Sequence, residues 1–79
     1  MEEKKMNKAE KTIGEKIKEW RKTKDLTQDA LAKKADMPYT TLAKIESDVI
    51  QNPSLQTITK IANGLEISID DLVNKNYEK

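Results

Sequence analysis

The side chains in this sequence that could do chemistry are carboxylates, lysines, tyrosines and hydroxyls, because the 79 residues include neither Cys nor His. Their absence removes thiol nucleophiles, imidazole bases, disulfides and the usual ligands of zinc and iron–sulfur clusters. A chain of this length buries only about 60% of the surface that its unfolded form exposes, so an enclosed active site has little room. We therefore expect no enzyme, no metal site and no cofactor, and we attribute the neighbouring acids Asp70 and Asp71 to helix capping.

The most informative polar residues lie on two short predicted helices joined by a tight turn. The helices, 28–35 and 39–47, are separated by only a few residues. Such a turn brings the helix axes close together, and Ala32 supplies the small side chain needed where they cross. Leu42 and Ile45 are expected to face the core, so the opposite face of the second helix is short, polar and directed outward. That face consists of Tyr39, Thr40, Ala43, Lys44 and Ser47.

Five short helices are expected to position these residues, which makes the fold class all-α. The expected helices are 13–24, 28–35, 39–47, 55–65 and 69–73. Thr27, Ser54 and Ser68 are each placed to cap the helix that follows. Pro38 stops the helix before it and suits the opening of the next one. The fourth helix has the strongest apolar pattern, formed by Leu55, Ile58, Ile61, Ala62 and Leu65.

The formal net charge of +1 hides an uneven distribution. Residues 1–24 carry nine Lys or Arg and five Glu, a net of +4, whereas residues 25–79 carry six Lys and nine acids, a net of −3. We expect a flexible charged arm over residues 1–12, a folded domain over 13–73 and a tail over 74–79. No apolar run approaches the ~20 residues that span a bilayer, and the first residues are charged, so we expect no membrane contact and a cytoplasmic location.

Two long segments of the sequence follow a known family pattern. They are LTQDALAKKADMPYTTLAKIES and NPSLQTITKIANGLEISIDDLV, and the pattern runs from about Ile13 to Val73. Thr-Gln opens the second helix, Ile-Glu stands near the end of the third, and Asn-Pro-Ser precedes the fourth. These features resemble the compact five-helix, helix-turn-helix domain of the Cro and lambda-repressor type, also called the xenobiotic-response-element family. The resemblance implies a sequence-specific, double-stranded DNA-binding regulator of transcription.

The resemblance also implies which residues contact bases. In such domains the helix that begins at Tyr39 lies in the major groove, with its N-terminal half against base edges. Tyr39, Thr40 and Lys44 are the implied base contacts, with a phosphate as the alternative for Tyr39. Ala43 is placed to meet a thymine methyl group and Ser47 lies at the far edge.

A second implied set contacts the DNA backbone. Gln28 stands at the start of its helix, where unpaired N–H groups and the positive end of the helix dipole favour an anion. The full set of implied phosphate contacts is Gln28, Thr41, Gln51, Asn52 and Ser54. Such contacts position a protein on DNA without selecting a sequence.

The resemblance assigns a structural role to Arg21 and Glu46. In related domains an Arg of the first helix pairs with a Glu at the end of the third, and these two residues match those positions. We expect the pair to hold the third helix against the first. Removing one partner would leave a poorly solvated charge, which costs several kcal/mol.

The chain departs from the family pattern at its helix ends, where Gly is common. Asp25, Asp36, Asp48 and Glu66 stand there instead, and Glu66 suits a left-handed backbone least. Asp36 and Asp48 flank helix 39–47, and acids near phosphates would weaken binding. Gly64, inside the fourth helix, is expected to cost about 1 kcal/mol relative to Ala.

Double-stranded DNA is the expected partner, bound by two copies on half-sites about one helical turn apart, so a homodimer is expected at least on DNA. A second hypothesis is an antitoxin-like or adaptor-like module whose main partner is a protein and whose DNA binding is secondary. The near-neutral charge and the acids beside helix 39–47 favour this alternative slightly. Val49, Ile50, Ile69 and Val73 could form an apolar surface for self-association.

Overall fold

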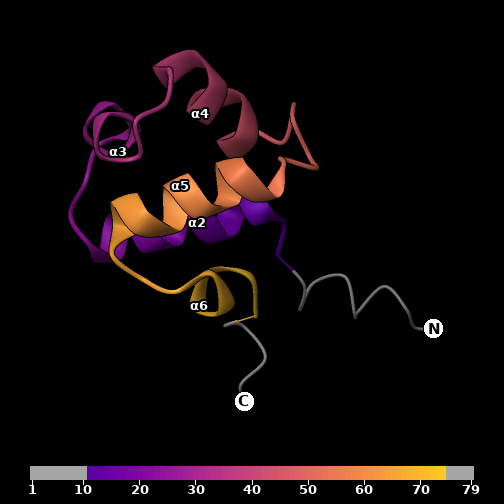
Figure 1. Ribbon diagram of the computed structural model, residues 1–79. Helices are drawn as coiled ribbons and strands as arrows, with labels where there is room; N and C mark the ends of the chain where they lie inside the picture. The colour runs from indigo at the N-terminus through magenta and orange to yellow at the C-terminus, as the bar shows by residue number, and fades with distance from the viewer. Residues whose placement is uncertain (1–10, 75–79) are drawn as a thin grey trace.

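The computed structural model describes residues 11–74, which form five α-helices and no strand (Figure 1). The helices are α2 (Ile13–Thr23), α3 (Gln28–Lys34), α4 (Tyr39–Glu46), α5 (Leu55–Leu65) and α6 (Ile69–Asn74). The predicted all-α, five-helix fold is therefore confirmed, with every helix end within one residue of its expected position. The expected arm over residues 1–12 and tail over residues 74–79 lie outside the described residues, apart from residues 11, 12 and 74.

The helices pack in three groups (Figure 1). α2 and α5 lie side by side in the middle, with α3 and α4 on one side of them and α6 on the other. The largest apolar side chains that are fully buried between the helices are Ile17, Leu31, Leu42, Ile45, Ile61, Leu65 and Leu72. Burying each of them contributes about 1.5–3 kcal/mol relative to leaving it exposed. Among residues 11–74, no helix has the length and apolar character needed to cross a membrane.

Side-chain hydroxyls cap the N-termini of four of these helices. Thr12, Thr27, Ser54 and Ser68 each accept a hydrogen bond from the backbone N–H three residues later, at N···O distances of 2.9–3.1 Å. The caps predicted at Thr27, Ser54 and Ser68 are confirmed. α4 differs, because Pro38 occupies its N-cap position and no side chain within the described residues caps this helix. The first N–H groups of α4 are therefore left without a side-chain acceptor.

Left-handed residues follow four of the helices, at the positions where the sequence departs from the family's glycines. The backbone φ angles are +59° at Asp25, +57° at Asp36, +69° at Asp48 and +62° at Glu66. The short carboxylate of Asp makes this conformation more tolerable than the longer side chain of Glu does. The expectation from the sequence is confirmed at all four positions, with the largest strain expected at Glu66.

One member of the predicted apolar stripe on α5 is not in the core. Leu55 is 72% exposed, whereas Ile58, one turn later, is 8% exposed. Leu55 is the first helical residue after the N-cap, and the stripe is covered by other helices only from Ile58 onward. Helical spacing thus identifies the apolar face of α5 but not where the covering of that face begins.

Two glycines allow helices to approach closely. A Cβ on Gly14 would lie 2.8 Å from the backbone oxygen of Glu46 and closer still to that of Ile45, so α2 and α4 touch at this point. A Cβ on Gly64 would lie 3.0 Å from both the backbone nitrogen of Ala35 and Cδ1 of Leu31. The propensity cost expected at Gly64 is thus accompanied by a close contact between α5 and the end of α3 that a larger residue would disturb.

Candidate nucleic-acid interface

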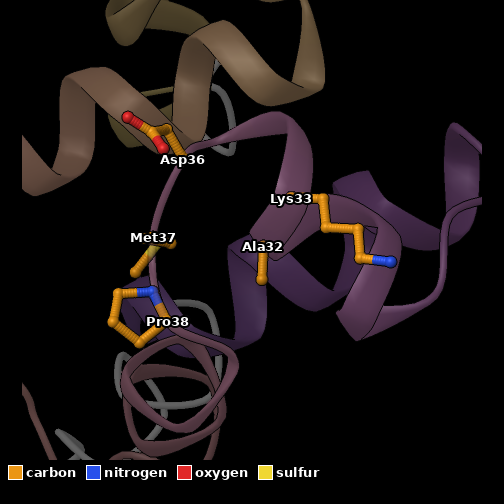
Figure 2. A pocket seen from close by; sticks show the side chains of 5 residues that line it. All are labelled: Ala32, Lys33, Asp36, Met37 and Pro38. Carbon is orange, nitrogen blue, oxygen red and sulfur yellow. The ribbon is translucent and has the colours of Figure 1, made fainter.

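The turn between α3 and α4 sets the position of the candidate surface. Ala32 is 2% exposed, and its carbonyl accepts a hydrogen bond from the backbone N–H of Met37 at 3.0 Å. Figure 2 shows Ala32 facing the turn at Met37 and Pro38, whereas the side chain of Lys33 points away. The small open pocket at this turn is lined by Ala32, Lys33, Asp36, Met37 and Pro38. The small residue predicted at the helix crossing is therefore in place.

α4 has one buried face and one exposed face. Leu42, Ile45 and Glu46 are at most 2% exposed. The opposite face holds the predicted base contacts, of which all but the half-buried Ala43 are exposed: Tyr39, Thr40, Ala43, Lys44 and Ser47. The structure therefore brings these five residues together on one short surface, as the sequence predicts.

The buried face of α4 carries an ion pair with α2. Arg21 donates from Nε to Oε2 of Glu46 at 2.9 Å and from Nη2 to Oε1 at 3.0 Å. Its third contact is a hydrogen bond from Nη1 to the carbonyl of Leu26 at 3.0 Å. The Glu46 side chain is only 2% exposed and that of Arg21 is 16% exposed. The predicted pair is thus present as a two-point contact, the strongest geometry available to these groups.

Gln28 connects this ion pair to the exposed face of α4. Its Nε2 donates to Oε1 of Glu46 at 3.0 Å, and its Oε1 accepts a hydrogen bond from the hydroxyl of Tyr39 at 3.2 Å. The sequence identifies Gln28 and Tyr39 as separate DNA contacts but misses the bond between them. The only sequence signal for it is that each residue opens its helix beside the same tight turn.

The predicted backbone contacts lie at both ends of the candidate surface. Gln51, Asn52 and Ser54 are exposed in the connection between α4 and α5, whereas Thr41 is half-buried on α4. The Ser54 hydroxyl already accepts from the Thr57 N–H at 3.1 Å, so part of its hydrogen-bonding capacity is used for capping. Their roles on DNA stay predictions.

The two acids that flank α4 have different surroundings. Asp36 is exposed, whereas Oδ1 of Asp48 is buried and has no hydrogen-bond partner among the described residues. That oxygen lies 2.9 Å from the point where a Cβ on Gly14 would stand, in the first turn of α2. A helix N-terminus favours an acid at this position. Oδ1 of the Asp48 carboxylate therefore lies against the first turn of α2.

The helix-turn-helix family model matches residues 17–72 of the chain. The chain belongs to the helix-turn-helix family. The resemblance drawn from the sequence is thereby confirmed, and the match includes the turn at Met37 and Pro38 together with all of α3, α4 and α5. This family is not an enzyme class.

The helix-turn-helix chain is similar to two bacterial or phage regulators. It is 35% identical over 66 residues to the HTH-type transcriptional regulator SinR of Bacillus subtilis (strain 168). The alignment covers 84% of this chain and 60% of SinR. It is 42% identical over 64 residues to an immunity repressor protein of Bacillus phage phi105, covering 81% of this chain and 44% of that protein. The chain therefore spans less than two thirds of the length of either relative.

Solved structures of SinR have the same arrangement of helices. The N-terminal DNA-binding domain of SinR from Bacillus subtilis has a TM-score of 0.76 and 35% identity, covering 84% of this chain and 96% of that one. SinR in complex with DNA has a TM-score of 0.73 and 36% identity, and the match covers 77% of this chain and 97% of the SinR chain. A chain from a complex of SinR with SinI has a TM-score of 0.76 and 34% identity, and the match covers 85% of this chain and 65% of that chain.

Proposed function

We propose that this helix-turn-helix chain is a sequence-specific, double-stranded DNA-binding regulator of transcription that places α4 in the major groove. The observation that carries the proposal is the exposed polar face of α4, held outward by a buried face and a tight turn. The similarity to SinR in complex with DNA supports DNA as the partner, because the match covers 77% of this chain at 36% identity. A role on DNA also implies a cytoplasmic location.

Lys44 and Thr40 are proposed as direct base contacts. Lys44 is exposed on α4 and can donate to O6 or N7 of guanine, while the Thr40 hydroxyl can pair with several base edges. A good base contact contributes about 1–3 kcal/mol of discrimination. Ala43 offers a methyl group to thymine, and Ser47 extends the surface at the last turn.

Backbone contacts are proposed on both sides of α4. The uncapped N-terminus of α4 presents free N–H groups and the positive end of the helix dipole to an anion. The Gln28 backbone at the start of α3 and the exposed Gln51 and Asn52 extend this surface. These contacts would supply affinity that falls steeply with salt, because each neutralised phosphate releases counterions.

Two copies are proposed to bind together on DNA, with half-sites about one helical turn apart. A single small domain covers little DNA surface, so one copy would bind weakly. Sedimentation of the chain with and without a selected duplex measures this directly. A complex containing one chain per duplex at saturation would contradict the proposed homodimer on DNA.

The test of the main proposal is selection from a randomised duplex pool at low salt, followed by salt titration of an enriched sequence. Lys44→Ala should weaken binding to that sequence by about fivefold to 150-fold and relax the preference at one position. Lys60→Ala is the matched control, because it removes the same charge from an exposed lysine on α5. Failure to enrich any sequence, or equal effects of the two substitutions, would overturn the proposal.

A protein-binding module is the second candidate function. SinR is found in a complex with the SinI protein, and that solved chain is similar to this one. Val49, in the α4–α5 connection, is 70% exposed and Leu55, the first residue of α5, is 72% exposed, which gives apolar surface to a protein partner. Val49→Ser with Leu55→Ser should weaken such an association, and it adds no negative charge beside the proposed phosphate contacts. Unchanged association of this variant with a protein partner would show that Val49 and Leu55 do not form the binding surface.

A further inference from the structure

The hydroxyl of Tyr39 is the last member of a chain of hydrogen bonds. The buried carboxylate of Glu46 determines which group donates and which accepts at each step of this chain. The chain runs from Arg21 through Glu46 and Gln28 to Tyr39, and it joins α2, α3 and α4. Glu46 is 2% exposed and held at two points by Arg21. Both oxygens of this carboxylate face N–H donors of Arg21 and Gln28, so both accept hydrogen bonds.

The carboxylate fixes the orientation of the Gln28 amide. Its Nε2 lies 3.0 Å from Oε1 of Glu46, a position that an amide oxygen could not occupy without facing a negatively charged oxygen. Oε1 of Gln28 therefore lies on the side of Tyr39. Because that oxygen only accepts, the hydroxyl of Tyr39 must be the donor across the 3.2 Å contact.

We infer that Tyr39 presents a hydrogen-bond acceptor to DNA and selects a base with an exocyclic amino group, adenine or cytosine. This inference rests on the proposed function. The hydroxyl proton is donated to Gln28, so only the lone pairs of the oxygen are left to bind DNA. The Tyr39 side chain is 49% exposed. In the major groove only N6 of adenine and N4 of cytosine offer a proton. Phosphate oxygens are acceptors, so this hydroxyl does not bind the DNA backbone.

The direction of the hydrogen bonds thus makes Tyr39 a specificity-determining residue. Removing its hydroxyl should change which bases are preferred and leave the affinity for other positions intact. A backbone contact would behave in the opposite way, because its loss weakens binding to every sequence equally. Gln28 acts as a positioning residue, since it contributes through the proton that it holds on Tyr39.

The experiment compares wild type with Tyr39→Phe, a surface change that keeps the ring. Each protein is first used to select duplexes from a randomised pool. The preferred adenine or cytosine at the Tyr39 position is then replaced by purine or 2-pyrimidinone, which lack the amino group. Wild type should lose about tenfold in affinity for the substituted duplex. Tyr39→Phe should bind both duplexes equally.

A second variant tests the direction of the bond. Gln28→Met removes the acceptor that holds the Tyr39 proton, while Arg21 still pairs with Glu46. The freed hydroxyl can then donate, so guanine or thymine should become acceptable at the same position. Unchanged discrimination in Gln28→Met, or an equal loss across all sequences in Tyr39→Phe, would overturn the inference alone. If wild type enriches no sequence, the proposed function fails and this inference fails with it.

Discussion

α4 and α5 show two ways of holding a helix in one small domain. α5 has eleven residues, a Ser54 cap and a buried stripe that contains no charged side chain. α4 has eight residues, no side-chain cap and a buried face that includes Glu46. α5 is thus held by apolar packing, whereas the end of α4 is held by a charged network.

The difference separates stability from binding. Apolar packing is non-directional, so α5 needs only a continuous stripe. α4 must keep its outer face free for contacts, and the network on its inner side fixes the helix through directed bonds to Arg21 and Gln28. The following changes test this contrast, from the largest expected effect on stability to the smallest.

Glu46→Ala should destabilise the fold by about 3–5 kcal/mol, because it leaves Arg21 poorly solvated without its partner. Urea unfolding measures the change in the free energy of unfolding. Glu19→Ala is the control, since the Glu19 side chain is 57% exposed and its surface pair contributes little. Equal midpoints for Glu46→Ala and wild type would show that the network does not hold α4.

Gly14→Ala should destabilise the fold by about 1–3 kcal/mol, because the new Cβ would force the α4 backbone away from α2. Gly64→Ala should cost less. The contact it creates is 3.0 Å, and the gain in helix propensity of about 1 kcal/mol opposes the cost. Thermal unfolding of both variants gives the order, with Asn63→Ala as the exposed control on α5. A larger loss of stability for Gly64→Ala than for Gly14→Ala would contradict the prediction that the α2–α4 contact is the tighter of the two.

Glu66→Gly should stabilise the fold by about 0.5–1 kcal/mol, because Gly adopts a φ of +62° without strain. The change removes an ion pair with Lys34 at 3.6 Å, but both side chains are substantially exposed and the loss is small. Asp25→Gly should gain less, since Asp tolerates the left-handed region better. A fall in melting temperature for Glu66→Gly would contradict the assignment of strain.

Lys44→Ala should leave the free energy of unfolding within about 0.5 kcal/mol of wild type, although it weakens DNA binding. Its side chain is exposed on the outer face of α4 and does not belong to the network of Arg21, Glu46 and Gln28. Urea unfolding beside a binding titration separates the two effects. A large loss of stability would mean that the outer face of α4 also holds the fold.

Local rules predicted most of the fold from the sequence. The caps at Thr27, Ser54 and Ser68 and the left-handed ends depend on residues close together in the chain, so they could be recognised without tertiary structure. The same holds for the exposed face of α4, which follows from helical spacing. The pairing of Arg21 with Glu46 came from the family resemblance, since nothing local connects residues 25 positions apart.

What the sequence could not predict depends on which distant segments meet. The exposure of Leu55, the direction of the Asp48 carboxylate and the close approach at Gly14 all require the packing of one helix on another. The bond from Tyr39 to Gln28 belongs to the same group, because it needs the geometry of the turn. Within the candidate interface, the bond from Tyr39 to Gln28 determines that the Tyr39 hydroxyl is a donor inside the protein.

The central claim is that the outer face of α4 contacts DNA while α5 supports the fold. It is tested most directly by amide NMR shifts of the chain during titration with a selected duplex. We expect the largest shifts over 39–47, the start of α3 and residues 51–54, with small shifts over the second half of α5 and in α6. Shifts concentrated in α6 or the second half of α5, with α4 unchanged, would contradict the account.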